Sequence, residues 1–128
     1  GFLDINPALF RMEILSAKEK KRIKTHILTG TDHFDFIPKD IFPLFYEAAT
    51  FHHENADGSG YPEGLLKSET PLLPRILHVV ESFISLTNRR SYHKRLGKKA
   101  ALAYLSQKND IYDTEIVTVL KKVLDIQK

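Results

Sequence analysis

Apolar residues recur every three to four positions along most of this 128-residue sequence, and that helical spacing constrains the fold more than any other feature. Ser16 and Glu19 form a capping-box pattern at the first such stretch, where Ile23 and Ile27 follow at helical spacing before Gly30. We therefore expect a helix over about residues 17–29, with His26 on its apolar side.

A second helix is expected from about residue 40 to the histidines at positions 52 and 53. It tolerates Pro43 in its first turn, and one face is expected to carry Phe42, Phe45, Ala49 and His52. Residues 55–70 are polar and rich in glycine and proline, which indicates a loop. This loop directly follows the two histidines.

Three further helices are predicted after the loop. Pro71 and Pro74 fit the start of a helix that runs to about residue 89, with a buried stripe at Leu73, Ile76, Val80 and Phe83. Shorter helices are expected over residues 98–107 and 113–126, the latter with Asp113 as N-cap and Ile116, Leu120 and Leu124 at four-residue spacing. No alternating strand pattern or internal repeat is present. The fold class is therefore predicted to be all-α, a helical bundle formed by residues 1–128 as one domain.

The composition excludes several classes of site. The sequence has no cysteine, so disulfides and thiolate metal ligands are ruled out and a metal would have to bind histidine nitrogen or carboxylate oxygen. Such a site favours iron, manganese or zinc. No segment reaches the roughly 20 apolar residues that cross a bilayer, and no signal peptide opens the chain. We therefore expect a cytoplasmic protein, with no membrane contact from this chain.

The run from His52 to Pro62, HHENADGSGYP, combines adjacent imidazoles, two carboxylates and two glycines in one short stretch. Neutral imidazoles can donate nitrogen lone pairs to a transition metal, while nearby carboxylates complete the coordination shell or orient the rings. Glycine lets the backbone approach a ligand closely. The alternative is purely structural, since Asp-Gly and Gly-Tyr-Pro could simply end a helix and form a turn.

The same run resembles the HHExxDGxGYP signature of the HD-GYP family, bacterial metal-dependent phosphodiesterases that act on cyclic di-GMP. The resemblance implies the all-α fold of the C-terminal portion of an HD-type domain. It also implies a divalent transition metal as cofactor, normally iron or manganese, and cyclic di-GMP as substrate. Hydrolysis would give the linear dinucleotide or GMP.

The resemblance assigns four residues as metal ligands, namely His26, His52, His53 and Glu81. His26 lies in a segment where the family has a histidine ligand followed by glycine four residues later. Glu81 stands where the family has aspartate. Its extra methylene displaces the carboxylate oxygens by more than the roughly 0.2 Å within which metal–ligand distances must be correct. We therefore expect Glu81 to be a weaker ligand. The alternative is that Glu81 pairs with Arg75 or His78 on the helix surface.

Substrate contacts are implied at two places. Arg90 matches the family's phosphate-binding arginine, and a planar guanidinium suits bidentate contact with a phosphodiester. His93 stands where the family often has lysine, which makes that contact weaker or pH-dependent. The loop residues expected beside the substrate are Asp57, Gly60, Tyr61 and Pro62. In the family this loop is associated with docking of diguanylate cyclase domains, so Tyr61 could instead face a protein.

The family's His-Asp pair does not occur among these residues, and Gly1 aligns with the glycine that follows the pair, with Phe2 in place of the usual lysine. In the family this pair bridges the metals, so the resemblance implies that a two-metal site requires it. The isolated chain is therefore expected to bind one metal poorly, to lack a complete catalytic set and to hydrolyse cyclic di-GMP negligibly, while the parent protein would be the enzyme.

Two other functions are alternatives to this one. A degenerate HD-GYP module would keep a surface for nucleotide or protein without hydrolysis, and the departures at Phe2, Glu81, Ile84 and His93 motivate this reading. A nucleic-acid-binding domain rests only on the net charge of +3. The basic runs at residues 18–24 and 121–128 lack interleaved aromatic residues, so no nucleic-acid partner is expected.

Overall fold

The computed structural model describes residues 16, 18, 21, 24–26, 36–88 and 95–124. Four helices lie entirely within the described residues: α3 (Phe42–Phe51), α4 (Leu72–Thr87), α5 (Lys98–Gln107) and α6 (Thr114–Val123). The described residues contain no extended strand, only an isolated antiparallel bridge between Asp57 and Leu66. The predicted all-α fold class is therefore confirmed.

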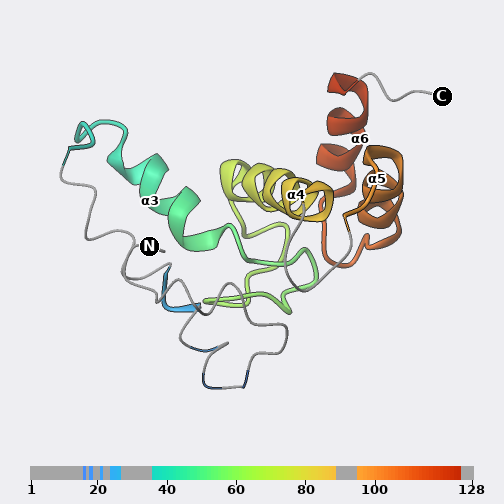
Figure 1. Ribbon diagram of the computed structural model, residues 1–128. Helices are drawn as coiled ribbons and strands as arrows, with labels where there is room; N and C mark the ends of the chain where they lie inside the picture. Colours follow the sequence, from blue (N-terminus) through green and yellow to red (C-terminus); the bar gives the residue numbers. More distant parts are fainter. Residues whose placement is uncertain are drawn as a thin grey trace.

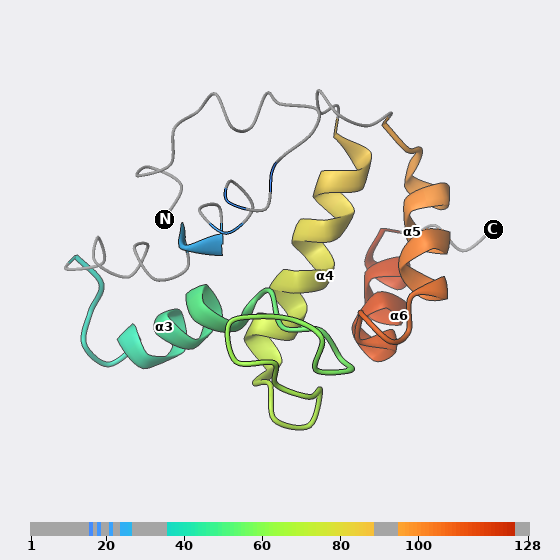
Figure 2. The same ribbon diagram turned by 90° about the horizontal axis from the view of Figure 1, so that it is seen from below.

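Helix α4 lies in the middle of the arrangement and contacts each of the other three helices (Figures 1 and 2). Helix α3 lies on one side of α4, while α5 and α6 pair with each other on the other side. The loop between α3 and α4 lies beside the end of α3 and the start of α4 (Figure 2). This arrangement places residues 52–71 against the first turns of the central helix.

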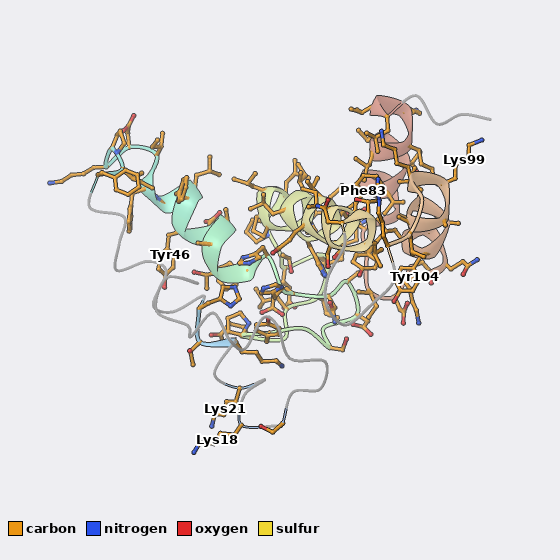
Figure 3. All side chains as sticks on the ribbon, in the orientation of Figure 1. Lys18, Lys21, Tyr46, Phe83, Lys99 and Tyr104 are labelled. Carbon is orange, nitrogen blue, oxygen red and sulfur yellow. The ribbon has the colours of Figure 1, made fainter. Side chains whose placement is uncertain are left out.

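The hydrophobic core lies between α4, α5 and α6. Its buried residues are Val79, Phe83, Ala101, Leu102, Leu105 and Val117. Figure 3 shows Phe83 where α4 meets the other two helices. Burying a valine, leucine or phenylalanine side chain contributes about 1.5–3 kcal/mol to the free energy of folding. These contacts therefore stabilise the C-terminal part of the fold.

Several predicted helix ends agree with the structure. Helix α5 has the predicted bounds, and the Asp113 carboxylate caps α6 by accepting the backbone N–H of Glu115 at 3.0 Å. Ile116, Leu120 and Leu124 pack against the core as expected. Helix α4 ends at Thr87, and residue 89, where its end was predicted, lies outside the described residues.

The buried faces of α3 and α4 differ from the prediction. In α4 the buried residues are Pro74, Val79 and Phe83, whereas Leu73, Ile76 and Val80 are only partly buried. Because α4 is contacted from both sides, its apolar surface is shared between two interfaces and a single stripe does not describe it. In α3 the buried residues are Ala48 and Thr50, while Phe45 is exposed.

The predicted helix over residues 17–29 lies mostly outside the described residues. Its described members Lys18, Lys21, Lys24 and His26 are helical, and His26 is buried. Among the described helices, α4 is the longest at 16 residues, and none has the length and apolar character needed to cross a membrane.

Polar contacts fasten the loop to the C-terminal half of the fold. The backbone N–H groups of Ala56 and Asp57 donate to the carbonyls of Ile111 and Asp110, both at 2.9 Å. Asp113 is almost fully buried, and its carboxylate pairs with Arg75 from α4 and with Lys67 from the loop. One carboxylate therefore connects the loop, α4 and the start of α6.

Candidate metal centre

His52 and His53 stand at the C-terminal end of α3, where His52 is the C-cap. The last carbonyls of a helix lack intrahelical donors, and His52 Nδ1 lies 3.1 Å from the carbonyl oxygen of Ala48, one turn earlier. With Nδ1–H donating to that carbonyl, the lone pair of His52 is on Nε2. This is the arrangement in which a metal-binding histidine presents one nitrogen and anchors the other.

His26 joins the pair from the N-terminal part of the chain. Its Nε2 lies 3.2 Å from His53 Nε2, and one nitrogen from each of His26, His52 and His53 falls within 4.8 Å of the others. Two nitrogens bound at about 2.0–2.1 Å to adjacent positions of one cation are separated by roughly 3.0–3.4 Å. The His26–His53 distance fits that separation, so this donor set suits a divalent transition metal.

The electrostatic surroundings keep His53 neutral. Burial is the largest cause, and repulsion from His52, His26, His78 and Lys24 adds to it, so that the pKa of His53 is lowered to about 3. A neutral imidazole retains its lone pair. At physiological pH His53 is therefore ready to donate to a cation without first losing a proton.

Glu81 lies on α4 at the edge of the histidine group. Its Oε2 is 3.8 Å from His52 Nε2, and its side chain is 43% exposed. Arg75, one of the two surface partners considered for Glu81, instead pairs with Asp113. Glu81 is thus next to the His52 donor nitrogen, although the tight group within 4.8 Å consists of the three histidines among the residues that the structure describes.

Glu54 has a structural function that sequence analysis did not assign. The residue is only 3% exposed, and its carboxylate accepts the backbone N–H groups of Glu63, Gly64 and Leu65 at 2.7, 3.1 and 3.0 Å. A buried carboxylate needs such partners. Glu54 therefore fixes the Gly-Tyr-Pro part of the loop against the end of α3.

Gly60 and Tyr61 lie directly beside the histidines. A Cβ atom at Gly60 would lie 2.3 Å from the backbone nitrogen of Asn55 and 2.5 Å from the His53 carbonyl oxygen, so only glycine fits. The Tyr61 ring stacks on the His53 ring, with a centroid distance of 4.8 Å and an interplanar angle of 25°. The Lys24 ammonium lies 4.2 Å from the Tyr61 centroid. Burial and nearby Glu81 raise the pKa of Tyr61 to about 12, which keeps its hydroxyl protonated.

The other predicted substrate residues have different positions. The Asp57 carboxylate is engaged by its own turn, since it accepts the Ser59 backbone N–H at 2.9 Å and the Ser59 hydroxyl at 2.6 Å. These hydrogen bonds lower the pKa of Asp57. Pro62 is exposed. Arg90 and His93 lie outside the described residues.

An open groove of about 240 Å³ adjoins the histidine group. Its lining includes His53, His78, Glu81, Tyr104 and Tyr112. Burial is the main cause of the lowered pKa of His78. The His78 ring also forms a hydrogen bond with the backbone of Glu54, and its centroid lies 4.9 Å from the centroid of the Tyr112 ring. The groove therefore runs from the candidate metal donors along α4 toward α5.

Sequence analysis missed the roles of Glu54, His78 and Lys24. Glu54 carried a signal, because it is part of the motif, but a glutamate beside two histidines suggested a metal ligand or a ring-orienting group. Lys24 and His78 had no usable signal, since their contacts join segments far apart in the chain.

Comparison with known families decides what this site belongs to. A sequence profile of the HD domain family matches residues 9–116, which is most of the chain and includes all three histidines. The chain belongs to the HD domain family. This membership agrees with an all-α fold in which separated helices bring histidines together.

Curated relatives of this HD domain are bacterial phosphodiesterases. A cyclic di-GMP phosphodiesterase of Thermotoga maritima is 32% identical over 116 residues, which cover 90% of this chain and 32% of that protein. The cyclic di-GMP phosphodiesterase response regulator RpfG of Xanthomonas campestris pv. campestris is 43% identical over 70 residues, covering 54% of this chain and 18% of that protein. A 3'3'-cGAMP-specific phosphodiesterase 3 of Vibrio cholerae is 33% identical over 86 residues, or 66% of this chain and 19% of that protein.

These relatives confirm the resemblance to HD-GYP proteins that the motif indicated. The chain spans about a third or less of the length of the curated relatives described above. The matched region is therefore only one part of each of these longer proteins.

Proposed function

We propose that the protein carrying this HD domain is a metal-dependent phosphodiesterase that hydrolyses cyclic di-GMP. The observation that carries the proposal is the convergence of His26, His52 and His53, whose donor nitrogens fit one divalent cation. Relatives named as cyclic di-GMP phosphodiesterases support the choice of substrate.

Each histidine would have a defined part in holding the cation. His52 presents Nε2 because its Nδ1–H bonds the Ala48 carbonyl, and His53 is neutral because burial lowers its pKa. Glu81 would add a carboxylate oxygen next to His52. When bound, a divalent transition metal polarises a phosphoryl oxygen and activates water as a nucleophile. Iron or manganese is the proposed metal, and a two-metal site would need the family's His-Asp pair.

Substrate binding is proposed to involve Arg90 as a phosphate clamp, with His93 as a second and weaker phosphate contact. The groove beside His53 is a suitable place for the rest of the nucleotide, because Tyr104 and Tyr112 give it an aromatic lining. Stacking of a nucleobase on aromatic side chains is a common means of recognition. Gly60, Tyr61 and Pro62 would form a rigid loop beside the histidine group.

The test is metal content and cyclic di-GMP turnover of the full protein, compared with a His52→Ala variant and with Glu115→Gln as a control. Glu115 has an 84% exposed side chain on α6 and should leave both readings unchanged. We expect His52→Ala to lose metal and turnover together. Turnover that survives removal of all metal by a chelator would contradict the proposal. The isolated 128-residue chain should show weak metal binding and negligible turnover.

A degenerate module is the second candidate function. Two departures from the family pattern favour it. Glu81 stands where the family has aspartate, and the exposed Ile84 stands where the family commonly has an acidic residue. Such a module would bind cyclic di-GMP or a protein partner without cleaving it. Measurable binding of cyclic di-GMP by metal-loaded full protein, with no product formed, would establish this alternative.

A protein partner is proposed on the outer side of the loop. The family resemblance implies docking of diguanylate cyclase domains there, and Pro62 and Glu63 are exposed while Tyr61 is half-buried. We expect a Glu63→Lys substitution to weaken binding of a purified diguanylate cyclase domain without changing metal content. Unchanged binding would argue against docking at this part of the loop.

A further inference from the structure

We propose that Tyr61 is a positioning residue of the metal centre, acting through the face of its ring on His53. The two rings lie at 4.8 Å between centroids and only 25° from parallel. The inference rests on the proposed function only in taking His26, His52 and His53 as metal ligands. It differs from a role in contacting substrate or a partner, because the contact that Tyr61 makes is with a ligand.

The orientation of His53 matters because the lone pair of an imidazole lies in the plane of the ring. A rotation of the ring about its bond to Cβ moves Nε2 away from His26, from which it is now 3.2 Å. Metal sites require distances correct to about 0.2 Å. A flat surface against the ring face restricts this rotation, and the Tyr61 ring provides that surface.

Tyr61 is itself held in place by the backbone around it. Its N–H donates to the carbonyl of His53 at 3.2 Å, so the two residues are linked through main chain as well as through their rings. Gly60 packs directly on the backbone of residues 53–55, and Glu54 binds the three N–H groups that follow Pro62. The loop is therefore fixed on both sides of Tyr61.

Lys24 adds a contact from the segment that carries His26. Its ammonium lies 4.2 Å from the Tyr61 centroid, a distance at which a cation is attracted to the ring face. Lys24 is two residues before His26. Tyr61 thus contacts both of the chain segments that carry His26 and His53, whose Nε2 atoms lie 3.2 Å apart.

The experiment measures cobalt(II) binding by the full protein, using the visible absorption of the bound ion to report ligand geometry. Three variants are compared with wild type: Tyr61→Phe, Tyr61→Ala and Tyr46→Ala. Tyr46 is a half-exposed tyrosine on α3 that contacts Phe42, so it controls for loss of an aromatic ring elsewhere. If Tyr61→Ala does not fold, Tyr61→Leu replaces it, because leucine fills much of the volume but offers no flat ring.

We expect Tyr61→Ala or Tyr61→Leu to weaken cobalt affinity by about tenfold and to change the absorption spectrum, in the range found for residues that support metal ligands. Tyr61→Phe should restore wild-type affinity and spectrum, since it keeps the ring, and Tyr46→Ala should leave both unchanged. A folded Tyr61→Ala or Tyr61→Leu protein with wild-type affinity and spectrum would overturn the positioning role, even if turnover fell. Absence of cobalt binding by the wild-type protein would overturn the proposed metal site as well.

Discussion

Gly60 is packed so closely against the end of α3 that any side chain at this position must displace backbone atoms. The nearest atoms to an added Cβ are the Asn55 nitrogen at 2.3 Å, the His53 carbonyl oxygen at 2.5 Å and the Glu54 Cα at 2.6 Å. All three belong to the backbone that carries the histidines. The effect of a substitution should therefore reach the metal donors.

We predict that Gly60→Ala lowers the free energy of unfolding by about 2–3 kcal/mol, because the overpacked backbone cannot relax locally. Gly97→Ala is the matched control, since a Cβ there meets nothing within 4 Å. It should cost at most about 1 kcal/mol through the weaker N-cap of α5. Urea unfolding of the three proteins gives the comparison, and equal losses for both variants would contradict the close packing.

Glu54 is the second residue whose effect can be predicted. Glutamine at this position keeps the size of the side chain but has one acceptor oxygen for three N–H groups, and its own NH₂ would face donors. We expect Glu54→Gln to lower the free energy of unfolding by about 1–3 kcal/mol. Denaturant unfolding with Glu115→Gln as the exposed control would detect this. Wild-type stability in Glu54→Gln would show that the carboxylate does not hold the loop.

At the level of elements, Asp113 connects three parts of the fold. Burial alone would raise the pKa of its carboxyl group, but hydrogen bonds from Lys67, Arg75 and the Glu115 backbone N–H outweigh burial and lower the pKa below 3.8. A carboxyl group with a lowered pKa in the folded protein stabilises it above the unfolded pKa. That contribution is lost as the pH falls through the lower, folded-state pKa.

We predict that Asp113→Asn costs about 1–3 kcal/mol at pH 7, a range that allows for the partial exposure of Lys67 and Arg75. Asparagine can still cap α6, so the loss measures the charge. The difference between wild type and variant should shrink as the pH falls below the unfolded-state pKa of about 4, because the unfolded chain then binds a proton that the folded carboxylate resists. Urea unfolding at pH 7 and pH 3 tests this, and a constant difference would contradict the ion pairs.

The ends of some helices could be predicted from the sequence, whereas their buried faces could not. The bounds of α5 and the cap of α6 were predictable because helix ends follow local rules of capping and breaker residues. The buried faces of α3 and α4 were not, because burial depends on which neighbours pack on each side. His26, His52 and His53 were predicted as metal ligands from a family resemblance, and the structure brings these three side chains together. The Tyr61 stack and the Glu54 hydrogen bonds could not be predicted, because they depend on the folded loop.

On the scale of the whole molecule, the described lysines of the two basic runs come from different parts of the fold. Figure 3 shows Lys18 and Lys21 at the opposite end of the view from α6, which carries Lys121 and Lys122.

The histidine group draws on segments that are far apart in the chain, since His26 precedes His52 and His53 by 26 and 27 positions. A cation held there would link the N-terminal part of the chain to the end of α3. Binding to the folded state alone stabilises that state by mass action, so metal should raise the free energy of unfolding.

The most direct test of the account is the metal content of the purified full protein by elemental analysis, for wild type and for a His26→Ala variant that still folds. We predict that the wild type carries iron or manganese and that His26→Ala loses most of it, because the partner of His53 Nε2 is removed. A His26→Ala protein that keeps the full wild-type metal content would contradict the claim that these three histidines form one metal centre.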